Sequence, residues 1–104
     1  MKILYQERGT GKTSQAIIES HKTGYTIVCN DVIQARFIKE KAYEANLVIP
    51  EPISLDKIIN TDSIRGRHIE GFIFDDAEFA LSYIVNHLTG INVEMITMSI
   101  PRKL

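Results

Sequence analysis

A short glycine-containing segment carries the strongest chemical signal in this sequence. It reads Gly9-Thr10-Gly11-Lys12-Thr13 and stands between an expected strand and an expected helix. Glycines let backbone N–H groups turn inward around an anion, and a helix starting at Lys12 directs the positive end of its dipole to the same place. Lys12 would reach the β- and γ-phosphates of a nucleotide, and the Thr13 hydroxyl is an oxygen ligand suited to Mg²⁺. The residues expected around a triphosphate are Arg8, Gly9, Thr10, Gly11, Lys12, Thr13 and Ser14.

Two adjacent carboxylates, Asp75 and Asp76, follow the apolar run Gly71-Phe72-Ile73-Phe74. Acidic residues directly after a strand are often helix N-caps, which have a favourable charge for the first helical turn. The phosphate-binding segment upstream favours a second interpretation, in which the end of this strand holds Mg²⁺ beside the phosphates. Both interpretations apply to this pair of residues, and we favour the magnesium site.

Short apolar runs alternate with segments of helical periodicity, which favours an α/β sheet covered by helices on both faces. Strands are expected at 3–5, 25–29, 47–49, 71–76 and 93–100. Helices are expected at 12–22, 31–45, 54–60 and 77–88. This order requires parallel strands joined by right-handed crossovers. We therefore expect one domain over residues 1–104, a three-layer α/β sandwich with a mainly parallel sheet.

In this setting Gly9–Thr13 resembles the Walker A motif of P-loop nucleoside triphosphatases. Phe72-Ile73-Phe74-Asp75-Asp76 resembles the Walker B motif of the same family. The resemblance covers nearly the whole chain and is to one minimal RecA-like lobe of the additional-strand catalytic-glutamate branch, which includes helicases and AAA+ proteins. It implies ATP and Mg²⁺ as cofactors, with Thr13 and Asp75 on the metal. Because compact single-lobe proteins of this kind recur in bacteriophage genomes, the resemblance also suggests a viral or prophage source by analogy.

The resemblance also assigns catalytic roles. It implies that Lys12 contacts the phosphates and that Asp76, at the position of the family's catalytic glutamate, polarises the attacking water. Glu78 is a weaker candidate for that base. A polar sensor is expected on the last strand, at Thr97 or Ser99; small polar residues on a strand are the other interpretation of these two.

Two positions depart from the family pattern. Gln6 stands where Walker A has glycine, and Asp76 is one methylene shorter than the catalytic glutamate. A shorter carboxylate displaces the proton acceptor, and a displacement of about 1 Å can cost roughly a hundredfold in rate. A single lobe also lacks the arginine finger that a second lobe supplies to its relatives, so we expect slow hydrolysis.

The composition excludes several other classes. A net charge of −1, from 12 Lys and Arg against 13 Asp and Glu, provides no global basic field for nucleic acid. The single cysteine, Cys29, excludes an internal disulfide and is expected to fill the core. The N-terminus becomes polar too early for a signal peptide or membrane span, which predicts a cytoplasmic protein. His21, His68 and His87 are given no role, and Arg65 and Arg67 are either solvated or act on a phosphate.

Three functions remain open. The first is a Mg²⁺-dependent ATPase or ATP-binding protein that serves replication, recombination or packaging in an assembly, with DNA, a replication protein or further copies of the chain as partners. The second is a degenerate P-loop pseudo-ATPase that binds and modulates a partner such as an AAA+ or recombinase ATPase. The third is a scaffold whose loop binds an anion incidentally.

Overall fold

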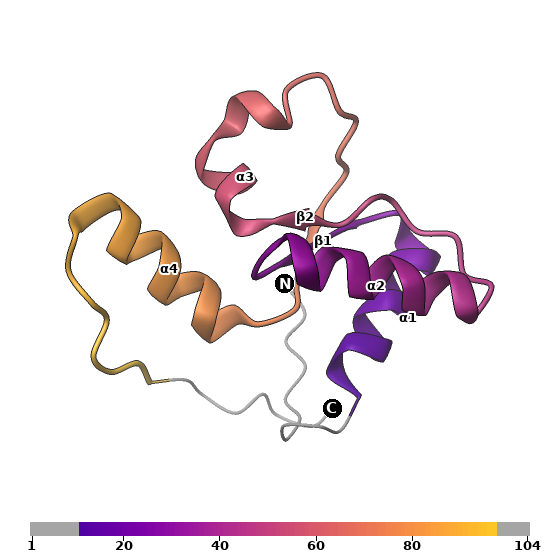
Figure 1. Ribbon diagram of the computed structural model, residues 1–104, viewed down its shortest axis with the longest axis horizontal. Coiled ribbons are helices and arrows are strands. Elements are labelled where there is room, and N and C mark those ends of the chain that lie inside the picture. Colours follow the sequence, from indigo (N-terminus) through magenta and orange to yellow (C-terminus); the bar gives the residue numbers. More distant parts are fainter. Residues whose placement is uncertain (1–10, 98–104) are drawn as a thin grey trace.

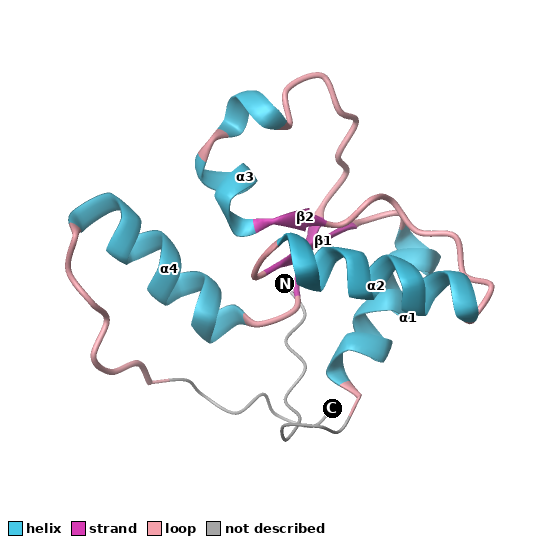
Figure 2. Cartoon of the chain, viewed as in Figure 1, coloured by secondary structure: helices cyan, strands magenta, loops and turns pink. Residues whose placement is uncertain are grey.

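Three parallel strands form the centre of the fold in residues 11–97, the part of the chain that the computed structural model describes (Figures 1 and 2). The strands are β1 (Thr26–Cys29), β2 (Ile53–Ser54) and β3 (Phe72–Phe74), in the order β2-β1-β3. In the parallel registers Val28 pairs with Ile53 and Ile27 pairs with Ile73. β1 is therefore the central strand of the described sheet, and all four of its residues are buried.

Four α-helices surround these strands. They are α1 (Lys12–Thr23), α2 (Val32–Glu44), α3 (Leu55–Ile59) and α4 (Ala77–Thr89), with a 3₁₀ turn at Thr61–Ser63 after α3. Their bounds follow local signals that the sequence predicted. Asp31 begins α2 by accepting a hydrogen bond of 2.8 Å from the Gln34 N–H, and Gly24 ends α1 in a left-handed conformation, where its N–H bonds to the Ser20 carbonyl.

The core divides into two clusters, one on each face of the sheet. Ile27 and Cys29 of β1 pack with buried residues of α1 and α2, whereas Val28 packs on the opposite face with Leu55 and with Ala80 of α4. Successive residues of a strand point to opposite faces, so one buried strand supplies both clusters. The described residues thus form an α/β fold in which helices flank a three-stranded parallel sheet.

The strand expected at 47–49 is not formed. Leu47 and Ile49 are partly buried and pack against the cluster that contains Ile27, so this apolar run contributes to the core as a loop. Proline has no N–H to donate to a sheet, and the strand in this part of the chain, β2, begins only after Pro52.

The last expected strand, 93–100, is also not formed over its described part. Residues 93–97 have no regular secondary structure, and Met95 is 78% exposed. The alternating pattern here corresponds to no buried face. The expected strand at 3–5 and residues 98–100 lie outside the described residues. None of the described helices has the length and apolar character needed to cross a bilayer.

Candidate functional site

The Thr13 hydroxyl and the Asp75 carboxylate meet at one end of the sheet. Thr13 Oγ1 donates to Asp75, with distances of 3.2 Å to Oδ2 and 3.4 Å to Oδ1, although the two residues are 62 positions apart in the chain. Both side chains are partly buried. This contact joins the start of α1 to the carboxyl end of β3, which is the place where ligands bind in open parallel sheets.

Backbone pairing positions Asp75. Its N–H donates to the Val28 carbonyl at 3.1 Å, which extends the pairing of β3 with β1 by one residue. The carboxylate therefore lies at the carboxyl end of β3, beside β1. Figure 1 shows this end of β3 leading into α4.

The start of α1 has the properties of an anion site. Gly11 is its N-cap, with φ of +91°, and has no side chain to cap the helix. The first turn contains no acidic residue, and Lys12, Thr13 and Ser14 are all partly buried there. The N–H groups of a first turn have no intrahelical acceptors, so they can bind an anion beside the helix. Arg8, Gly9 and Thr10 lie outside the described residues.

Asp76 occupies a different position from Asp75. It is exposed and is the N-cap of α4, where its Oδ1 accepts a hydrogen bond of 3.1 Å from the Phe79 N–H. The helix-cap interpretation of this acidic pair therefore describes Asp76, and Asp75 is the carboxylate that faces α1. Glu78 is exposed in the first turn of α4.

Cys29 is the last residue of β1. It is only 2% exposed, and its Sγ contacts the Ile53 carbonyl oxygen at 3.4 Å. Burial, followed by the nearby carboxylates of Asp75 and Asp31, raises the pKa of Cys29 to about 11. A thiol with so high a pKa is a poor nucleophile at neutral pH, so Cys29 is a core residue.

The donor set fits a magnesium ion that arrives with phosphates. A hydroxyl and a carboxylate within 3.2 Å of each other are oxygen ligands of the type that Mg²⁺ takes. The described residues contain no group of three or more His, Cys, Asp or Glu side chains able to hold a metal. Mg²⁺ typically takes only one or two protein oxygens and completes its shell with phosphates and water.

The remaining sequence candidates lie elsewhere. Arg65 forms an exposed ion pair with Asp62 at 3.3 Å, and Arg67 Nη2 donates to the Glu51 carbonyl at 2.9 Å. Thr97 is exposed in an irregular segment, so it is not on the expected sensor strand; Ser99 lies outside the described residues.

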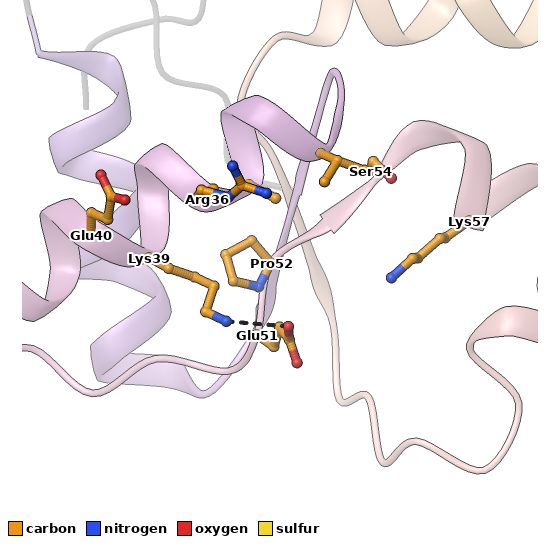
Figure 3. A pocket seen from close by; sticks show the side chains of 9 residues that line it. Arg36, Lys39, Glu40, Glu51, Pro52, Ser54 and Lys57 are labelled. Atoms are coloured by element: carbon orange, nitrogen blue, oxygen red, sulfur yellow. Dashed lines mark hydrogen bonds and ion pairs between the residues drawn. The ribbon is translucent and has the colours of Figure 1, made fainter.

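Sequence reasoning missed one further arrangement. Arg36 and Lys39, together with Lys57, line a groove between α2 and α3 (Figure 3). Their spacing of three on a helix predicts a shared face, whereas the approach of Lys57 depends on the tertiary fold.

No model of a known protein family matches this chain, and no curated protein or solved structure matches it either.

Proposed function

We propose that this protein binds ATP together with Mg²⁺ and hydrolyses it slowly, in the service of nucleic-acid transactions. The observation that carries the proposal is the contact between Thr13 and Asp75. Two motifs that the sequence places far apart are within hydrogen-bonding distance, one at a helix N-terminus and the other at a strand end. A phosphate-binding motif and a metal-binding motif need this proximity if they are to serve one nucleotide.

Each residue then has a defined task. The first-turn N–H groups of α1 and the Lys12 ammonium bind the phosphate oxygens, and Gly11 brings the backbone close to them. Thr13 and Asp75 present their oxygens on the same side, where they would hold Mg²⁺. The metal, when bound, neutralises charge that develops on the phosphates during transfer.

Asp76 is the proposed general base. It directly follows the metal-side carboxylate, and its hydrogen bond to the Phe79 N–H fixes the carboxylate at the start of α4. Oδ1 accepts this bond, which leaves Oδ2 to accept a proton from the attacking water.

The same hydrogen bond favours a second candidate function. A carboxylate that only caps α4 leaves the site without a base, and the protein then binds nucleotide as a pseudo-ATPase that modulates a partner protein. Measuring ATP binding and phosphate release separately distinguishes the two functions.

Titration with a fluorescent ATP analogue, with and without Mg²⁺, tests the binding step. We expect Lys12→Ala to lose at least about tenfold in affinity, which is about 1.4 kcal/mol. We expect Thr13→Val to remove most of the gain that Mg²⁺ provides, while Thr13→Ser retains it. Lys22→Ala, at the opposite end of α1, is the matched control and should bind as the wild type does. Equal affinities for wild type and Lys12→Ala would overturn the proposal.

Phosphate release with Mg²⁺ and ATP, measured in the presence of DNA, tests the second step. Release by the wild type that exceeds release by Asp75→Asn supports an ATPase. Nucleotide binding with release at background gives preference to the pseudo-ATPase.

A further inference from the structure

A basic groove lies along the outer edge of β2, away from the contact of Thr13 with Asp75. It has a volume of about 320 Å³ and lies between α2 and α3, with Pro52 and Ser54 among its lining residues. In the order β2-β1-β3, β2 pairs only with β1, so no described strand covers its other edge. Figure 3 shows Arg36 above Pro52, while Lys39 and Lys57 approach from the two sides.

The cations of the groove exceed the acids that could neutralise them. Lys39 Nζ lies 3.4 Å from Glu51 Oε1, in a pair whose side chains are 54% and 68% exposed. Arg36 and Lys57 have neither a hydrogen bond nor an ion pair within the described part of the chain. The remaining acid, Glu40, points away from Pro52 and Glu51 (Figure 3). Glu40 nevertheless lines the groove, so its lining contains three cations and two acids.

The positions of these cations suit an extended anion. They extend from two separate helices across an open groove, so they match charges repeated along a chain better than one compact anion. The Arg36 guanidinium can donate two parallel hydrogen bonds to a phosphate, and Lys57 adds a mobile point charge. Arg67 supplies a further cation beside Glu51, to whose carbonyl it donates.

Apolar surface beside the cations favours a single strand. Val32, which lines the groove, is 58% exposed and provides apolar surface beside the cations. A single strand exposes its bases to such a side chain, whereas a duplex keeps its base faces stacked inside.

We infer that this groove binds the phosphodiester backbone of single-stranded nucleic acid, with Arg36 and Lys57 as the principal contacts. The inference rests on the proposed function, because it supplies the nucleic-acid partner of the nucleotide site. It places that partner at the edge strand of the sheet, distinct from the residues that would hold ATP.

Fluorescence anisotropy with a labelled thymidine oligonucleotide of about 16 nucleotides, at about 50 mM salt, tests the inference. The Arg36→Ala/Lys57→Ala double variant should lose at least about tenfold in affinity. The slope of log affinity against log salt should become shallower by about 1.4, since each contact to a single strand contributes about 0.7. Arg36→Lys/Lys57→Arg keeps both charges and should retain binding.

A matched control variant loses the same number of positive charges from another part of the surface. Lys22→Ala/Arg65→Ala removes one lysine and one arginine outside the groove and should bind the oligonucleotide as the wild type does. No binding by the wild type, or equal binding by the groove variant, would overturn the inference. A duplex of the same length that binds as tightly as the single strand would overturn its single-strand specificity.

The failure of this inference is distinguishable from failure of the nucleotide site. The groove variant should bind the ATP analogue with wild-type affinity, and Lys12→Ala should bind the oligonucleotide normally. Loss of oligonucleotide binding in Lys12→Ala would contradict a separate groove.

Discussion

The two neighbouring carboxylates after β3 have different partners. Asp75 accepts from the Thr13 hydroxyl, whereas Asp76 accepts from the Phe79 N–H at the start of α4. One carboxylate therefore faces α1, and the other faces its own helix. The cap interpretation applies to Asp76, whereas the proposed metal site uses Asp75.

Asparagine at position 76 separates the cap from the proposed base. Asn is about as good an N-cap as Asp, so Asp76→Asn should leave the free energy of unfolding within about 1 kcal/mol of the wild type. It should lower the rate of phosphate release at least about tenfold, because an amide does not accept the proton. Urea denaturation and a phosphate-release assay give the two readouts.

Asp31→Ala is the control for this experiment. It removes an equivalent cap from α2, so it should cost about 1 kcal/mol of stability without slowing a turnover corrected for folded protein. Wild-type turnover in Asp76→Asn would show that Asp76 only caps the helix.

Ionisation of Cys29 should make the free energy of unfolding depend on pH in the alkaline range. Its thiol titrates at about 11 in the folded protein, against an ordinary pKa of 9.0. Between these values the unfolded chain binds fewer protons than the folded protein, so the free energy of unfolding falls as the pH rises. We expect this fall to be smaller in Cys29→Ser, as measured by urea denaturation from about pH 8 to pH 11. Parallel curves for the two proteins would contradict the shifted pKa.

Among the elements, α1 begins after a glycine at its N-cap. Gly11 and Gly90 both have positive φ, +91° and +74°, and an added Cβ at either position would meet nothing within 4 Å. Alanine therefore costs backbone energy of about 1 to 2 kcal/mol at both positions, without a steric clash.

Only one of these variants should affect ligand binding. We expect Gly11→Ala to weaken binding of the ATP analogue at least about tenfold, because the strained residue relaxes and moves the first-turn N–H groups. Gly90→Ala, beyond the C-terminus of α4, should lose similar stability and keep its affinity. Equal affinities after correction for folded protein would remove Gly11 from the site.

The helices were predictable because their signals are local. Asp31, Asp76, Gly24 and Gly90 cap helices where the sequence places them, and caps act over one helical turn. Strand assignments depend on distant partners. The apolar run at 47–49 has the composition of a strand, but it packs as a loop, and pairing starts only at Ile53.

The approach of Thr13 to Asp75 could be predicted in a similar way. Both motifs occur at element ends, and parallel strands bring their carboxyl ends to one edge, so the approach of Thr13 to Asp75 followed from element order. The basic groove could not be predicted from element order, because it forms only where the fold brings Lys57 of α3 near Arg36 and Lys39 of α2.

For the whole molecule, binding of ATP with Mg²⁺ should raise the melting temperature. Without a three-ligand metal cluster in its described part, the protein should gain little from Mg²⁺ alone. ATP with Mg²⁺ at about 100 times the Kd adds about 2.7 kcal/mol, which for a domain of this size raises Tm by about 10 °C or more. Differential scanning fluorimetry checks this, with Thr13→Val as the control. An equal shift with Mg²⁺ alone would contradict a metal site completed by phosphates.

The distance in sequence between Thr13 and Asp75 has a consequence for biosynthesis. Thr13 and Asp75 are 62 positions apart, and both β1 and β2 are synthesised between them. A nascent chain that has not yet released Asp75 from the ribosome holds only one half of the site. The proposed nucleotide site is therefore complete only after the chain has emerged through Asp75, and a translation product that ends before this residue would lack the proposed metal-side carboxylate.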